Sequence, residues 1–386
     1  MLDKNDGVRR GPFGSSLKKE IFVENSDYVV YEQQNAIYDN YKTRYNISKE
    51  KFDELHKFSL KENDFIMSGA GTIGRISRVP KGIKPGVFNQ ALIRFRINSE
   101  LTSPEYFLQF IRAENMQRKL TGANPGSAIT NLVPMTEVKN WDIFVPAKAE
   151  QSKLGAFFNQ LDNTIALHQQ KQRQIRSLKQ GFIKNLFPNN KNSAPRIRFS
   201  IFNDDWNQRN ASEIFTSVSD KNYPELPVLS ASQEKGMVLR ESNGIDIKYD
   251  QKSTGTYKRV LPGQFVMHLR SFQGGFAYST IEGITSPAYT ILAFRNKEDH
   301  YPLFWKSIFS SKNFIKRLEA ITYGIRDGRS ISYADFSTLR FWIPSYEEQK
   351  QIGDFIESID ATIAFYQRQI DMMQSLKKEL LNKMFI

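Results

Sequence analysis

The 386-residue chain contains no cysteine. This absence excludes disulfides, thiolate metal sites and cysteine nucleophiles together, and it suits a reducing compartment. Only four histidines occur, far apart, so no paired spacing of the HExxH kind predicts a metal site. No run of about 18 apolar residues is present, so we expect no membrane span. The first residues have no apolar signal-peptide core, and we therefore expect a cytoplasmic protein.

Catalytic signatures are scarce as well. The chain has no GxxxxGK[ST] loop and no Ser-His-Asp set in a recognisable local context. Residues 69–74, GAGTIG, do match the GxGxxG dinucleotide-binding fingerprint. A true fingerprint opens a helix and precedes an acidic residue by about 20 positions, whereas β-like, proline-broken sequence follows here. We expect a tight loop and no enzyme, and we keep a nucleotide-binding enzyme that uses Gly69–Gly74 as an alternative.

The chain does contain an internal repeat, in which one segment occurs twice. Residues 145–188 and 343–386 are identical at 14 of 44 positions. In both copies apolar residues recur in alternating steps of four and three, the spacing of a coiled-coil seam. His168 and Gln172 interrupt the first seam. This interruption either fixes the register of the helices or leaves the seam locally exposed.

The organisation along the chain is domain, helix, domain, helix. Both globular parts contain strand-like runs and amphipathic helical segments in a comparable order. The strand-like runs include 27–32, 91–97, 263–269 and 289–295, and the helical segments are 103–120 and 301–320. A strand-like end, WDIFVP or LRFWIP, precedes each long helix. An Asn-, Ser- and Pro-rich linker follows the first helix. We expect an α+β protein with two mixed α/β domains at 1–144 and 201–343, a central spacer helix at 145–188, a linker at 189–200 and a C-terminal spacer helix at 344–386.

The charge is unevenly distributed. The formal net charge is +13, yet residues 145–200 alone carry 10 basic and 2 acidic residues. Both globular parts are only mildly positive. If they bind DNA, they need base contacts or a partner protein for affinity, because phosphate attraction alone is weak at such charge.

The best candidates for recognition are loop clusters of Arg, Lys, Ser, Asn and Gln, whose side chains reach phosphates and base edges. A single such residue is more often an ordinary solvated loop residue, so the clusters are better predictions than their members. In the first domain the candidates are Arg9, Arg10, Ser15, Ser16, Lys18, Lys19, Arg75, Asn89 and Gln90. In the second domain they are His268, Arg270, Ser271, Gln273, Tyr323, Arg326 and Arg329.

Two dissimilar domains, each followed by a helix that begins P…EQ…(L/I)G.F…(L/I)D..I, resemble the specificity subunit of type I restriction-modification systems. The stretch APRIRFSIFNDDWNQRNASEIF at 194–215 also resembles the start of a target-recognition domain in this family. The resemblance covers nearly the whole chain. The first domain has no counterpart of that stretch, so the resemblance leaves two alternatives: residues are missing before Met1, or the chain is a true variant with a shorter first domain.

The resemblance implies a non-catalytic subunit in which each domain recognises one half of a split site in double-stranded DNA. The two helices are then expected to pack as an antiparallel coiled coil, to set the spacing and to dock two methyltransferase subunits, joined by restriction/translocase subunits in the full complex. S-adenosylmethionine, ATP and Mg are expected on those partners, with no cofactor or metal in this chain. A coiled-coil scaffold that binds no DNA is a further alternative.

Residues that recur off the seam are candidate partner contacts, because a docking surface present twice would repeat its side chains. They are Gln151, Gln169, Lys179, Gln349, Gln367 and Lys377.

Overall fold

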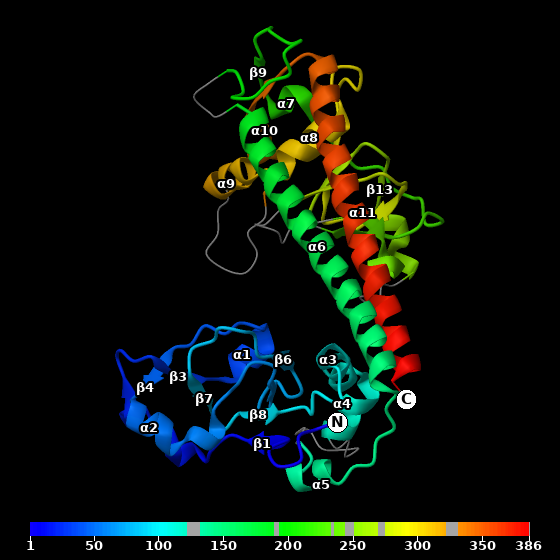
Figure 1. The fold of residues 1–386 in the computed structure, drawn as a ribbon. Coiled ribbons are helices and arrows are strands. Elements are labelled where there is room, and N and C mark those ends of the chain that lie inside the picture. Colours follow the sequence, from blue (N-terminus) through cyan, green and yellow to red (C-terminus); the bar gives the residue numbers. More distant parts are fainter. Residues whose placement is uncertain are drawn as a thin grey trace. The chain divides into compact units, whose positions relative to one another are not determined.

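The chain forms two compact units. The computed structural model describes residues 1–121, 132–188, 193–232, 235–243, 251–268, 275–321 and 331–385. Unit 1 consists of Met1–Gln169 and Arg368–Ile386, and unit 2 of Gln170–Gln367. Each unit holds one globular part and a portion of each long helix, and the mixture of helices and strands confirms the predicted class (Figure 1). The five-segment division stays a prediction, since the compact units divide both long helices.

Unit 1 is built on two four-stranded sheets, with strand orders β1-β8-β5-β6 and β2-β4-β3-β7. All pairs of the first sheet are antiparallel, whereas β3 and β7 pair in parallel. The strands are β1 Val8–Arg10, β2 Phe22–Val23, β3 Tyr28–Tyr31, β4 Tyr45–Ile47, β5 Phe65–Ser68, β6 Ile76–Arg78, β7 Gly86–Phe88 and β8 Leu92–Phe95. The helices are α1 Gln33–Tyr38, α2 Lys49–Glu54, α3 Pro104–Arg112, α4 Glu114–Thr121 and α5 Met135–Lys139.

Unit 2 repeats the first of these sheets with the strand order β10-β17-β14-β15. Its strands are β9 Asn207–Asn210, β10 Phe215–Val218, β11 Leu229–Ser232, β12 Gly236–Leu239, β13 Lys258–Val260, β14 Phe265–Met267, β15 Phe276–Tyr278, β16 Gly283–Thr285, β17 Thr290–Phe294 and β18 Arg340–Ile343. Its helices are α7 Ala211–Ile214, α8 Pro302–Phe309, α9 Lys312–Ile321 and α10 Tyr333–Ser337.

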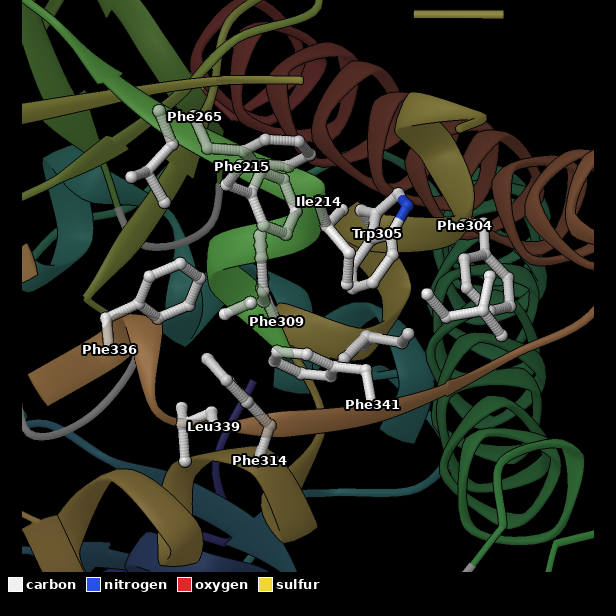
Figure 2. Packing of buried hydrophobic residues seen from close by; sticks show 14 of the residues in the cluster. Ile214, Phe215, Phe265, Phe304, Trp305, Phe309, Phe314, Phe336, Leu339 and Phe341 are labelled. Carbon is white, nitrogen blue, oxygen red and sulfur yellow. The ribbon is translucent and has the colours of Figure 1, made fainter. Parts of the chain in front are cut away.

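The core of unit 2 is largely aromatic (Figure 2). Phe215, on β10, is fully buried, and its ring lies 4.9 Å from that of Trp305 on α8. Further rings within 6.4 Å belong to Phe265, Phe294, Phe309 and Phe336. Burial of each such side chain contributes about 1.5–3 kcal/mol, so this cluster fixes the position of the sheet against α8.

The two long helices are α6 Lys148–Leu186 and α11 Tyr346–Met384, each of 39 residues. In unit 1 the ring of Phe158 lies 5.6 Å from that of Phe385, so the first half of α6 meets the end of α11. In unit 2 the ring of Phe182 lies 5.0 Å from that of Phe355, so the second half of α6 meets the start of α11. The helices therefore run antiparallel, as the resemblance implied (Figure 1).

The polar interruption of the seam lies inside the helix pair. Gln172 is only 9% exposed, and its Nε2 donates to Oε1 of Gln367 at 2.9 Å and to the carbonyl oxygen of Ile363 at 3.3 Å. The interpretation of a locally exposed seam is therefore wrong at Gln172. A buried side chain with partners on one facing turn favours one register of the two helices.

The structure differs from two local predictions. Segments 103–120 and 301–320 are each predicted as one amphipathic helix, but each forms two helices, α3 with α4 and α8 with α9. The break between the two helices changes the direction of the second, so its apolar residues pack against the same hydrophobic core as those of the first. The strand-like run WDIFVP forms no strand, whereas its counterpart LRFWIP contains β18, which pairs with β9. Residues 142–145 have no such partner in the described part of the chain, and a strand exists only where a neighbour supplies its backbone hydrogen bonds.

Candidate nucleic-acid interface

Three loops of unit 1 leave its first sheet at the same end. β1 and β5 end there and β6 and β8 begin there, because the antiparallel register pairs Arg10 with Ile93 and Ser68 with Leu92. Backbone hydrogen bonds join the loops: the N–H of Gly11 donates to Leu92 at 2.9 Å, and the N–H of Gly69 donates to Ala91 at 2.7 Å. The sheet thus gathers residues 11–17, 69–75 and 89–91.

The predicted residues of unit 1 lie on or beside this sheet end, with different exposure. A Cβ on Gly14 would lie 3.8 Å from the side chain of Gln90, so the cluster that begins at Arg9 and the pair at Asn89 meet in space. The side chain of Arg9 already forms an ion pair within unit 1, since it donates twice to the carboxylate of Asp6 at 2.7 and 2.9 Å. Ser16 and Asn89 are half-buried; those that are exposed are Arg10, Ser15, Lys18, Lys19, Arg75 and Gln90.

The GAGTIG loop connects β5 to β6 in an antiparallel hairpin. Gly71 and Gly74 have φ of +62° and +83°, which only glycine adopts without strain. Arg75 closes the loop, since its N–H donates to Oγ of Ser68 at 3.0 Å and its carbonyl accepts from the N–H of Ser68 at 2.8 Å. No helix follows, so the loop lacks the N-terminus that a dinucleotide pyrophosphate needs, and the expectation of a tight loop is confirmed.

Sequence reasoning missed two residues at this end. Gln33, the first residue of α1, donates from Nε2 to the carbonyl oxygen of Ala70 and so lies beside the GAGTIG loop. Phe13 is 87% exposed within the loop after β1. An exposed aromatic ring can stack on a base or contact a thymine methyl group. Phe13 lies between Arg10 and Ser15, two predicted DNA-binding residues, so its position in the sequence could have identified it as a candidate.

Unit 2 presents the corresponding end of its own sheet. Met267 pairs with Thr290 there, and His268 follows directly, with its ring 6.1 Å from that of Tyr289. Burial lowers the pKa of His268, which favours its neutral form. Six of the predicted residues lie outside the described residues: Arg270, Ser271, Gln273, Tyr323, Arg326 and Arg329.

Two lysines that sequence reasoning missed lie near this end of unit 2. Lys258 on β13 donates from Nζ to the carbonyl oxygen of Tyr289 at 2.6 Å. Burial lowers the pKa of Lys258, and the positive charge of Lys221 lowers it further. Only the fold brings them together, because they are far apart in the sequence.

The recurring glutamine near the start of each long helix is internal. Gln151 is 1% exposed, and its Oε1 accepts from the N–H of Ser103 at 3.1 Å. Its Nε2 donates to the carbonyl oxygens of Leu101 at 3.2 Å and Pro146 at 2.9 Å. The side chain thus ties the start of α6 to the start of α3.

Gln349 repeats this arrangement in unit 2. It is 1% exposed, its Oε1 accepts from the N–H of Tyr301 at 3.0 Å, and its Nε2 donates to Asp299 at 3.0 Å and Pro344 at 3.2 Å. Each bonded position is 198 residues beyond its counterpart in unit 1. The sequence repeat therefore extends in three dimensions back into the globular parts.

The recurring lysines bridge the two helices. Lys179 donates to the carboxylate of Asp360 at 2.5 and 2.7 Å, and Lys377 donates to that of Asp162 at 2.6 and 2.8 Å. These pairs are also related by the 198-residue repeat. Partner contact by the six recurring residues stays a prediction, but Gln151, Gln349 and both lysines already act within the chain. Gln367 is exposed but accepts the hydrogen bond from Gln172, and Gln169 is half-buried.

Replacing Lys179 by Glu is expected to destabilise the helix pair by about 1 kcal/mol, because two carboxylates would then face each other at a partly exposed site. The double variant Lys179→Glu with Asp360→Lys should recover most of this loss, and added salt should reduce the difference. Urea unfolding, followed by far-UV circular dichroism, measures the free energy of unfolding of each variant. Lys184→Glu, on an exposed position of the same helix, is the matched control. A double variant no more stable than Lys179→Glu would contradict the pairing.

Two negative findings limit the chemistry of the described residues. Among them, no group of three or more His, Asp or Glu side chains is arranged to hold a metal ion. No helix in the same part of the chain is long and apolar enough to cross a membrane.

Comparisons with known proteins agree with this geometry. Residues 13–177 match the model of the type I restriction modification DNA specificity domain. The S subunit of a type I restriction-modification system from M. genitalium is 14% identical, with 100% of this chain and 98% of that chain covered and a TM-score of 0.56. A chain from a structural study of complex assembly and conformational transition of the type I R-M system is 15% identical, with the same coverage and TM-score. No curated protein matches the chain.

Proposed function

We propose that the chain is a DNA specificity subunit of a type I restriction-modification system and that each unit reads one half of a two-part DNA site, because residues 13–177 match the specificity domain of that family and the chain shares its fold with two solved structures from such systems. The observation that carries this proposal is the repeated sheet end. In unit 1, loops with basic, amide and aromatic side chains leave one end of a four-stranded sheet, and in unit 2 His268 and Tyr289 lie at the corresponding end of the sheet β10-β17-β14-β15. The loops differ in sequence, so the two half-sites differ.

Base readout is the proposed source of affinity. Both globular parts carry little net charge, so phosphate attraction alone is insufficient. Arg10, Gln90 and Arg75 are exposed at the sheet end of unit 1, and arginine and amide side chains form bidentate contacts with guanine and adenine in the major groove. Phe13 adds an apolar contact, and Lys221 with Lys258 adds phosphate contacts in unit 2.

The long helices are proposed to set the distance between the half-sites and to dock the methyltransferase subunits, joined by restriction subunits in the full complex. A continuous helix of 39 residues at 1.5 Å per residue spans about 58 Å. The basic stretch 145–200 supports electrostatic contact with DNA between the half-sites. We propose that the chain itself is non-catalytic, and that S-adenosylmethionine, ATP and Mg are bound by the partner subunits.

Exchange of residues 201–343 for the equivalent domain of another specificity subunit is expected to change one half of the methylated motif completely and leave the other half unchanged. The reason is that each sheet end belongs to one unit. Methylome sequencing of cells that carry the gene with its methyltransferase partner measures both halves at once.

The reciprocal exchange of residues 1–144 is the matched control, and it should change the other half only. A change of both half-sites in either exchange would contradict the assignment of one reader to each unit. Methylation with no sequence preference in the unmodified protein would contradict the proposed function as a whole.

A further inference from the structure

Three side chains of unit 1 donate hydrogen bonds to backbone carbonyl oxygens of the GAGTIG loop. Gln33, on α1, and Ser68, on β5, each donate to a carbonyl oxygen near the tip of the loop. Gln117, on α4, donates from Nε2 to the carbonyl oxygen of Gly74 at 3.1 Å. These bonds replace water at the carbonyl groups, and they therefore favour one conformation of the loop.

The side chain of Gln117 is itself held in place. Its Nε2 also donates to the carbonyl oxygen of Ile111, on α3, at 2.6 Å, so both hydrogens of the amide are used. Met116 and Leu120, on the same helix, are 6% and 1% exposed and pack into the hydrophobic core of unit 1. The amide of Gln117 thus reaches the loop from a helix that the core fixes.

Gly74 is the residue that permits this contact. Its φ of +83° is strained for any residue with a Cβ, and a Cβ at this position would lie 2.1 Å from Oε1 of Gln117. Backbone conformation and close approach therefore both require glycine here. The amide of Gln117 packs directly against the backbone of the loop.

Arg75 follows Gly74 directly and is exposed. Its backbone N–H donates to Oγ of Ser68 at 3.0 Å, whereas its guanidinium has no hydrogen-bond partner among the described residues. The backbone from which this side chain extends is thus fixed by Ser68 on one side and by Gln117, through Gly74, on the other. A free guanidinium on a fixed backbone suits a bidentate contact with a base, since such a contact needs a defined direction.

Unit 2 has no amide at the equivalent position of the repeat. The residue 198 positions after Gln117 is Ile315, on α9. An isoleucine side chain cannot donate a hydrogen bond to a loop. A substitution of Gln117 should therefore affect the half-site that unit 1 reads and no other.

We propose that Gln117 is a positioning residue for DNA recognition by unit 1. It holds Gly74 and thereby sets the direction in which Arg75 reaches a base pair, while Gln117 itself contacts no DNA. This inference rests on the proposed function. Without the amide, the hairpin keeps its pairing between β5 and β6, but Arg75 takes several directions and discriminates less sharply between bases.

Methylation by the chain together with its methyltransferase partner tests this inference. The substrates are duplexes that contain the motif of the unmodified protein, with each base pair changed in turn. Gln117→Leu should lower discrimination about fivefold or more at one or two adjacent base pairs of the half-site read by unit 1, and Arg75→Ala should lower it at the same base pairs. Arg118→Gln, at an exposed position of α4 that bonds Glu114 of the same helix, should leave discrimination unchanged.

Combining the substitutions separates positioning from folding. In the Arg75→Ala background, Gln117→Leu should cause no further loss of discrimination, because Gln117 acts through Arg75. Hydrogen exchange should become faster at residues 69–75 and stay slow in β5 and β8. If Gln117→Leu unfolds unit 1, the same measurements are made with Gln117→Asn, which keeps the amide on a shorter side chain that does not reach Gly74.

The outcomes distinguish this inference from the proposed function. Unchanged discrimination in Gln117→Leu overturns the inference alone, and so does a loss at base pairs that Arg75→Ala leaves unaffected. An equal loss in both half-sites overturns it as well, because Gln117 belongs to unit 1. Absence of any sequence preference in the unmodified complex overturns the proposed function, and this inference with it.

Discussion

Replacing Gln349 by Leu is expected to lower the free energy of unfolding of unit 2 by about 3 kcal/mol or more. Leucine fills a similar volume, but it leaves three backbone groups without a partner: the N–H of Tyr301 and the carbonyl oxygens of Asp299 and Pro344. Each unsatisfied buried group costs about 1–3 kcal/mol. The loss should appear in unit 2, because all of these groups belong to it.

Hydrogen exchange with mass spectrometry measures this prediction, because it reports on each unit separately and needs no assumption that both unfold together. Gln351→Leu, at an exposed position two residues later on α11, is the control and should change stability by less than about 0.5 kcal/mol. Gln151→Leu should give the same loss in unit 1 alone. Equal effects of Gln349→Leu and Gln351→Leu would show that the buried bonds contribute nothing.

Replacement of the repeated glycines Gly155 and Gly353 by alanine is expected to lower the free energy of unfolding, whereas replacement of Gly181 should raise it. A Cβ on Gly155 would lie 2.6 Å from the backbone nitrogen of Tyr106, and a Cβ on Gly353 would lie 2.8 Å from that of Phe304. Real Cβ atoms do not approach backbone so closely, so α6 must shift from α3, or α11 from α8. We expect a loss of about 1–3 kcal/mol in the unit concerned.

Gly181 provides the matched control within α6. A Cβ there would have no atom within 4 Å, so Gly181→Ala should stabilise the helix by up to about 1 kcal/mol through its higher helix propensity. Chemical denaturation with hydrogen exchange as the local readout compares the variants. If Gly155→Ala and Gly353→Ala stabilise the protein as Gly181→Ala does, the close contact between the helices and the globular parts is not present in solution.

Much of the architecture could be predicted from the sequence. The steps of four and three predicted both long helices to within three residues at either end. The strand-like runs around Val30, Ile93, Val266 and Leu292 all form strands. These predictions succeeded because they depend on local periodicity, which a burial pattern imposes directly on neighbouring positions.

The candidate site was predictable only as separate clusters. The segment that begins at Arg9 and the pair at Asn89 meet because β1 and β8 pair antiparallel, which no local pattern states. Gln33 and Lys258 were missed for the same reason, since they reach their sheet ends from other elements. Recurrence alone also suggested that Gln151 and Gln349 face a partner, whereas their bonds lie inside each unit.

The sequence by itself determined that two similar units exist, where their helices lie and which residues recur, since a repeat and a period are properties of the chain alone. Only the tertiary structure decided what the recurring residues do. Gln151, Gly155 and Lys377 recur because they join a helix to a globular part or to the other helix, and such contacts depend on distances across the fold. It also decided that the same apolar pattern is a buried strand at Phe341 and exposed at its counterpart Ile143, because among the described residues a neighbouring strand pairs only with the segment of Phe341.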